Sequence, residues 1–101
     1  MPESIHVGKL HELKEEEGRL VEGAGKEIAV FRKGDRVFAF DNTCPHQGGP
    51  LSEGMIDGEQ VICPWHAWVF NMNTGDSPVA PKVKIVTYPV RFDGADVYVE
   101  V

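Results

Sequence analysis

Residues 44–51 read CPHQGGPL and residues 63–70 read CPWHAWVF, and these two segments carry the strongest signal in the chain. In each of them a cysteine is followed directly by proline, and a histidine stands two or three positions after the cysteine. Proline and glycine favour loops, so each segment is expected to turn its thiol and its imidazole toward one point. The candidate metal ligands are therefore Cys44, His46, Cys63 and His66.

Three interpretations compete for these four residues. Each loop could hold a buried cysteine and a surface histidine without any metal, but the repetition of the Cys-Pro and histidine pattern argues against this. A tetrahedral zinc site uses the same ligand types, although its two cysteines usually stand close together, as do its two histidines. In a [2Fe-2S] cluster, two cysteines can hold one iron and two histidines the other. Loops that mix the two ligand types suit the cluster.

Outside the two segments, apolar residues alternate with polar ones around three turn signals, which predicts three β-hairpins. Their turns are expected at residues 33–35, 57–58 and 93–95, and the third hairpin is expected to begin with one strand over residues 85–92. The hairpin around Asp57-Gly58 lies between the two Cys–His segments and would bring them to one end of a sheet.

Long helices are not expected, because 11 glycines and 7 prolines are spread along the chain. The best helical candidate, Leu10–Glu17, is short and ends in three acids, which favours a solvated turn. The length of 101 residues is enough for one domain and too little for two. We therefore expect one all-β domain over residues 1–101, either a sandwich or a small barrel.

The net charge of −6 argues against a nucleic-acid partner and would suit a protein partner with a basic docking face. Glu53 and Asp57 are candidate acidic docking residues near the Cys–His loops. The first twenty residues carry charges throughout, and no later run approaches about 20 apolar residues, so the sequence predicts no membrane partner. With 2 cysteines there is no disulfide framework, which favours a cytoplasmic protein.

The pattern C-P-H-x-G-x-x-L, followed by C-P-x-H-x-W-x-F and by Thr74-Gly75, resembles Rieske-type iron-sulfur proteins. The similarity extends through the flanking hairpins and covers nearly the whole chain. It implies a Rieske fold, an antiparallel β-sandwich with a small cluster-binding subdomain whose loops lie at 44–51 and 63–70. By position in the motif, Cys44 and Cys63 would bind the inner iron, and His46 and His66 the outer iron. Residues 77–81 would cover the cluster, and Ala67 stands where the family frequently has glycine.

The same resemblance implies a function in one-electron transfer. The short soluble form is similar to the ferredoxin components of ring-hydroxylating oxygenases and to the small subunit of assimilatory nitrite reductase. We expect a carrier without catalysis of its own, which takes electrons from a reductase and passes them to a terminal oxygenase or another redox enzyme. A nitrite reductase subunit is the alternative within the family, and a zinc-binding interaction module is the alternative outside it.

High-potential Rieske proteins add a disulfide and two hydroxyl donors that this chain lacks. Gly49 and Trp65 stand at the disulfide positions, and Trp68 and Phe70 stand where the serine and tyrosine hydroxyls would be. Hydroxyl donors stabilise the reduced, more negative cluster, so their absence implies a low reduction potential. Backbone N–H groups oriented around Gly48 and Gly49 would remain as donors to the thiolates.

The remaining notable residues are given structural roles. Trp65 and Trp68 are expected to form an apolar cover over the cluster loop rather than an electron relay. The other two histidines, His6 and His11, lie in a charged segment without a paired cysteine and are expected on the surface. Three apolar residues are expected to pack beneath the loops, namely Leu51, Met55 and Ile56.

Overall fold

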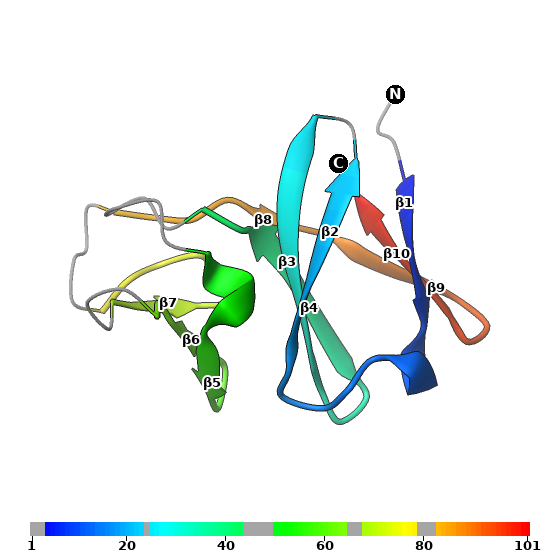
Figure 1. The fold of residues 1–101 in the computed structure, drawn as a ribbon, viewed down its shortest axis with the longest axis horizontal. Helices are drawn as coiled ribbons and strands as arrows, with labels where there is room; N and C mark the ends of the chain where they lie inside the picture. The colour runs from blue at the N-terminus through cyan, green and yellow to red at the C-terminus, as the bar shows by residue number, and fades with distance from the viewer. Residues whose placement is uncertain (1–3, 24, 44–49, 65–67, 79–82) are drawn as a thin grey trace.

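The structure is a computed structural model that describes residues 4–23, 25–43, 50–64, 68–78 and 83–101. Within these ranges the chain forms ten β-strands and two short 3-10 helices, and the strands pair antiparallel in three sheets. Figure 1 shows two of the sheets side by side and the third, smaller sheet set apart from them. The prediction of an all-β fold is confirmed.

The central sheet has four strands in the order β2-β3-β4-β8. Their bounds are Gly18–Gly23, Lys26–Lys33, Arg36–Asp41 and Thr87–Tyr88. The hairpin predicted around residues 33–35 is the β3–β4 pair, in which Lys33 faces Arg36. Gly34 in its turn has a φ of 61°, a backbone conformation that glycine adopts without steric cost. The sequence prediction is correct for this hairpin.

The second sheet joins the two ends of the chain in the order β1-β10-β9. Its strands are Ser4–Lys9, Asp96–Glu100 and Val90–Asp93. The predicted turn at 93–95 is present, but a single strand over residues 85–92 is wrong. Pro89 separates β8, which pairs with β4, from β9, which pairs with β10. Proline has no N–H for a ladder and a fixed φ, so the chain changes sheets at this residue.

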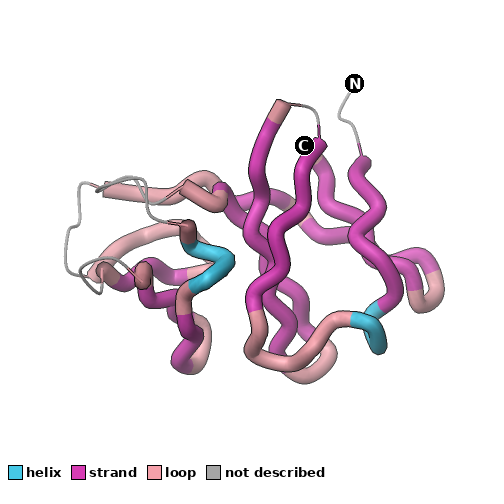
Figure 2. The backbone as a smooth tube through the Cα atoms, viewed as in Figure 1, coloured by secondary structure: helices cyan, strands magenta, loops and turns pink. Residues whose placement is uncertain are grey.

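The small sheet is built from β5 (Met55–Asp57), β6 (Gln60–Ile62) and β7 (Val69–Asn71). The β5–β6 pair is the hairpin predicted around Asp57-Gly58. Before it comes a 3-10 helix, η2 (Leu51–Glu53), which Figure 2 shows between the small sheet and the central sheet. Residues 50–78 thus form a small subdomain in which neighbouring strands in sequence are neighbours in space.

Strands β3 and β4 are buried on both faces, and each face belongs to a different hydrophobic cluster. Ala29 and Phe31 of β3 point toward the small subdomain, and Ile28 and Val30 point toward the β1-β10-β9 sheet. Side chains alternate between the two faces of a strand, so a run of apolar residues is needed to fill both clusters. The central sheet is therefore the shared middle layer of the molecule.

Close packing of the backbone joins the small subdomain to the central sheet at Gly18. A Cβ atom at this position would overlap the carbonyl oxygen of Ser52 and lie 2.7 Å from the Phe31 ring. Only glycine allows β2 and η2 to approach this closely, so Gly18 sets the distance between the two parts.

The segment Leu10–Glu17 forms a short 3-10 helix, η1 (Leu10–Glu12), followed by a turn, as the acidic run predicted. Arg32 of β3 anchors this turn: its guanidinium donates to the carbonyl of Leu13 at 3.0 Å and to the carbonyl of Gly34 at 2.7 Å. Among the residues described, no helix is long and apolar enough to cross a membrane.

Candidate metal centre

Cys63 directly follows β6 and begins the second Cys–His segment. Its backbone N–H donates to the carbonyl of Trp68 at 2.7 Å, which continues the β6–β7 ladder by one pair and closes the loop between them. The Cys63 side chain is 1% exposed. Three other residues of this segment, Trp65, His66 and Ala67, lie outside the described residues.

The first Cys–His segment lies between two paired ends. Thr43 and Pro50 form an antiparallel bridge, and the N–H of Leu51 donates to the carbonyl of Asn42 at 2.7 Å. Residues 44–49, which include Cys44, His46, Gly48 and Gly49, lie outside the described residues. The residues on the two borders of this segment therefore lie side by side, as expected for a ligand loop.

Asn42 is a buried polar residue that the sequence analysis missed. Its side chain is 5% exposed, its Oδ1 accepts the N–H of Ser52 at 2.8 Å, and its own N–H donates to the carbonyl of Glu27 at 3.0 Å. Asn42 therefore ties the end of β4, the first turn of η2 and β3 together. An asparagine directly before a loop is a signal for such a side-chain bond to the backbone.

The ends of three loops meet in one hydrophobic cluster. Leu51 ends the first segment, Cys63 and Trp68 lie in the second, and Val83 lies two residues beyond the segment 77–81 that the family resemblance places over the cluster. Leu51 and Cys63 are buried members of this cluster, and Trp68 and Val83 pack against it. The structure thus brings the described borders of both ligand segments together at one site.

The register of the small sheet places Cys63 among particular neighbours. Val61 faces Phe70, and Cys63 bonds to Trp68 two pairs further along, beyond the Ile62–Val69 pair. Because side chains alternate between the faces of a sheet, these four side chains share one face. The rings of Trp68 and Phe70 lie 6.4 Å apart. Trp68 packs against the cluster as expected of an apolar cover, and Phe70 is 0% exposed.

The chemistry of this site fits a [2Fe-2S] cluster with mixed ligands. Two ferric ions, two sulfides, two thiolates and two neutral imidazoles sum to a net charge of zero in the oxidised state. A neutral group can be enclosed by apolar side chains such as Leu51, Phe70 and Met72 at little electrostatic cost, whereas an all-thiolate cluster would bring two negative charges. The candidate ligands for the group are Cys44, Cys63, His46 and His66.

The prediction for the three residues beneath the loops is partly correct. Leu51 is 0% exposed and Ile56 packs against the same cluster, but Met55 is 73% exposed, so its assignment to the core is wrong. Met55 and Ile56 are neighbours on β5, an edge strand, and because side chains alternate between its faces only Ile56 points inward. Met55 pairs with Ile62, the residue before the buried Cys63, and its own side chain lies at the surface.

The acidic residues and histidines proposed for the surface are found there. Glu53 and Asp57 are exposed, although Asp57 lies at the β5–β6 turn, the end of the sheet opposite to Cys63. His11 is exposed. The His6 side chain is 52% exposed, and its Nε2 lies 3.1 Å from the Asp96 carboxylate.

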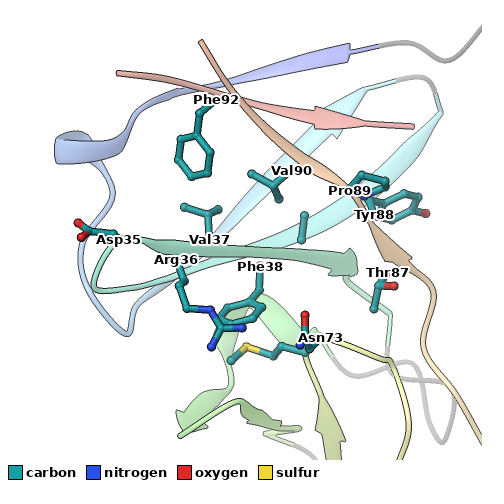
Figure 3. Close-up of a pocket in the computed structure, with 12 residues that line it drawn as sticks. Asp35, Arg36, Val37, Phe38, Asn73, Thr87, Tyr88, Pro89, Val90 and Phe92 are labelled. Carbon is teal, nitrogen blue, oxygen red and sulfur yellow. The ribbon is translucent and has the colours of Figure 1, made fainter. Parts of the chain in front are cut away.

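A cavity of about 500 Å³ lies beside β4, and Figure 3 shows Val37, Val90 and Phe92 on one side of that strand and Arg36 on the other. It exists because β8 pairs with β4 only at Ala39 and Phe40, which leaves residues 36–38 paired with β3 on one side and without a β8 partner on the other. Burial raises the pKa of Tyr88 in its wall, and the Asp41 carboxylate adds to this effect. Asn73 lines the cavity beyond the end of β7 that is far from Cys63, and Met72 beside it also belongs to the hydrophobic cluster that contains Cys63.

Replacing Asn42 by alanine is expected to lower the free energy of unfolding by about 1–3 kcal/mol. The variant loses the acceptor of the Ser52 N–H and leaves a partly buried donor unpaired. Urea unfolding of wild type and variant measures the difference. The matched control is Asn73→Ala, at an exposed turn position, with an expected change within about 0.5 kcal/mol. Equal stability of Asn42→Ala and wild type would contradict the anchoring role.

Comparison with known proteins agrees with the predicted fold and cofactor. The family model of the Rieske [2Fe-2S] domain matches residues 3–89. The ferredoxin component of the naphthalene 1,2-dioxygenase system of Pseudomonas aeruginosa is 33% identical over 97 residues, which are 95% of this chain and 93% of that protein. The chain therefore belongs to the Rieske [2Fe-2S] domain family, and its cofactor is a Rieske-type [2Fe-2S] cluster.

Two solved structures show the same fold. A chain of the complex of reduced oxygenase and oxidised ferredoxin in carbazole 1,9a-dioxygenase superposes with a TM-score of 0.87 at 33% identity, covering 94% of this chain and 99% of that one. A chain described as the NADH-dependent nitrite reductase small subunit of Mycobacterium tuberculosis superposes with a TM-score of 0.94 over 100% of this chain and 96% of that one, at 23% identity. The predicted Rieske fold is confirmed.

Proposed function

We propose that this protein is the ferredoxin of an oxygenase system, which carries one electron at a time from a reductase to a terminal oxygenase. The observation that carries the proposal is the end-to-end match with a dioxygenase ferredoxin component, over 95% of this chain and 93% of that protein. A match of this extent leaves no part of the chain for a catalytic domain. The protein acts as a carrier and not as an enzyme.

The proposed ligand set is Cys44 and Cys63 on one iron and His46 and His66 on the other. Support comes from the two Cys–His segments, from the paired ends of the first loop, and from the burial of Cys63 beside Trp68. When bound, the cluster supplies one-electron storage, and neutral imidazoles make reduction easier than four thiolates would. The chain's own residues enclose the site and exclude water.

The whole chain, residues 1–101, is proposed to act as a single domain. Strands β3 and β4 contribute to both hydrophobic clusters, so neither the small subdomain nor the β1-β10-β9 sheet has a core that is independent of the central sheet. We also propose a cytoplasmic location, because a reducing compartment keeps cysteine ligands as thiols before a cluster is inserted.

The experiment is a single-turnover reaction between the chemically reduced, cluster-containing protein and purified oxygenases from the naphthalene and carbazole dioxygenase systems. Oxidation of the carrier together with hydroxylated product from the oxygenase would support the proposal, and the carrier without oxygenase should form no product. Failure to reduce either oxygenase, combined with co-purification of a nitrite reductase catalytic subunit, would favour a nitrite reductase small subunit, whose support at present is a shared fold.

Electron transfer to or from the physiological partner is expected to slow as salt rises, when association limits the rate. The net charge of −6 gives long-range attraction to a basic face, and salt screens charges beyond about 8 Å at physiological ionic strength. Stopped-flow rates between low and high salt measure the effect. Glu53→Gln should reduce the salt dependence, and Asp93→Asn in the distant β9–β10 turn should not. A rate independent of salt would contradict electrostatic steering.

A further inference from the structure

Ser77 carries a buried hydroxyl that the fold itself does not use. Its side chain is 3% exposed, and Oγ has no hydrogen-bond partner in the part of the chain that the structure describes. It is the one orphaned side-chain oxygen or nitrogen found among the buried groups of those residues. Buried polar groups are nearly always satisfied, so an orphaned hydroxyl points to a partner other than the described protein atoms.

The course of the chain carries Ser77 toward the metal centre. The N–H of Asn71 donates to the carbonyl of Asp76 at 2.7 Å, so the chain turns back after β7 and runs again along that strand. Figure 1 shows this yellow segment returning to the outer end of the small subdomain. From Asp76 onward the chain therefore runs alongside β7 from Asn71 toward Val69. Val69 adjoins the pair formed by Trp68 and Cys63.

The other end of the same segment returns to the same cluster. Asp76 forms an antiparallel bridge with Lys84, and their side chains approach to 3.3 Å between Nζ and Oδ1. Ile85 and Val83, which flank Lys84, belong to or pack against the cluster that contains Cys63. Ser77 is thus a buried residue that directly follows the Asp76–Lys84 bridge, and the residues on both sides of Lys84 contact the hydrophobic cluster that contains Cys63.

We propose that the Ser77 Oγ–H donates a hydrogen bond to a sulfur atom at the [2Fe-2S] site. This inference rests on the proposed ligand set. Sulfide and thiolate sulfurs carry negative charge and accept hydrogen bonds. The described side chains of the hydrophobic cluster that contains Cys63, among them Phe70 and Met72, are apolar and offer no competing strong acceptor. Ser77 would supply a donor in a chain that has Trp68 and Phe70 where other Rieske proteins have hydroxyls.

The donor has a defined effect on the redox equilibrium. Reduction adds one negative charge to the site, and a hydrogen bond to sulfur becomes stronger when the acceptor becomes more negative. Ser77 therefore stabilises the reduced protein more than the oxidised protein, and it raises the reduction potential. Ser77 acts only through this hydrogen bond to sulfur and does not itself exchange the electron.

The test is a redox titration of the cluster-containing protein against a one-electron dye of known potential. Ser77→Ala should lower the equilibrium constant for reduction three- to tenfold, where tenfold corresponds to about 59 mV for one electron. Ser77→Thr keeps the hydroxyl and should restore most of the wild-type value. The control Ser52→Ala removes a hydroxyl from η2 and should leave the constant unchanged.

A second measurement keeps the proposal testable if Ser77→Ala does not hold a cluster. Pulsed EPR of the reduced wild type in H₂O and D₂O detects exchangeable protons coupled to the cluster, and Ser77→Thr should retain a hydroxyl proton coupling. An unchanged equilibrium constant in Ser77→Ala, or the absence of a hydroxyl coupling in the wild type, would overturn the proposal. If either result is obtained with a protein whose cluster is intact and still transfers electrons to an oxygenase, the Ser77 hydrogen bond is refuted and the proposed carrier function is not.

Discussion

Replacing Cys63 by serine is expected to abolish the [2Fe-2S] cluster. The wild type, expressed and purified without oxygen, should be red-brown and contain about two irons and two acid-labile sulfides per chain. A serine oxygen is a poor substitute for a soft thiolate ligand. Because Cys63 is only 1% exposed, a ligand from the solvent cannot reach the iron in place of the lost thiolate. Iron and sulfide analysis together with the visible absorption spectrum measures the loss.

The matched control is Met55→Ser, which introduces the same side chain on the neighbouring strand. Met55 faces Ile62, one residue before Cys63, but is 73% exposed and lies outside the core, so the variant should retain its iron and colour. Cys63→Ser protein with two irons and an unchanged spectrum would refute the ligand assignment. Stoichiometric zinc and no iron in the wild type would contradict the cluster itself.

The reduction potential is expected at the low end of the Rieske range, at about −150 mV rather than about +300 mV. Phe70 is fully buried and shares a sheet face with Cys63, so the position where high-potential proteins carry a tyrosine is filled here by a ring without a donor. A carrier with such a potential can accept electrons from a nicotinamide- or flavin-dependent reductase but is badly placed to oxidise a quinol. Spectroelectrochemical titration measures the midpoint.

Phe70→Tyr tests the cause of the low potential. A hydroxyl on this ring, within reach of a ligand sulfur, should raise the midpoint by tens of millivolts, since about 30 mV is about 0.7 kcal/mol for one electron. Phe40→Tyr is the control, because Phe40 is equally buried but belongs to β4 of the central sheet. A native midpoint above about +100 mV would show that donors other than the missing hydroxyls dominate.

Local sequence signals predicted those parts of the fold that depend on local chemistry. The turns at Gly34, Gly58 and Gly94 all have positive φ, and each joins the two strands expected around it. Each Cys-Pro segment follows a strand, as expected, since β4 ends at Asp41 shortly before the first segment and β6 ends at Ile62 directly before the second. In these cases a single residue type determines a backbone conformation, so no distant contact is needed.

Elements that depend on distant partners were missed. Strands β1, β2 and β7 are short or polar, and their pairing is decided by the strand beside them. Ile5 and Val7 do alternate in β1, but so short a pattern is weak until β10 provides a partner. The role of Asn42 was missed for the same reason, because its bond to Ser52 depends on how η2 folds back.

The sheet that joins the two ends of the chain has a consequence for the order of folding. Ser4 pairs with Glu100, whereas the strands of the small subdomain pair with their immediate neighbours in sequence. Contacts between distant residues require closure of a long loop and form slowly. During synthesis, β1 leaves the ribosome before β10 and cannot pair until β10 has emerged. The β5–β7 sheet can pair long before then, and in hydrogen-exchange pulse labelling its amides should gain protection before those of β1.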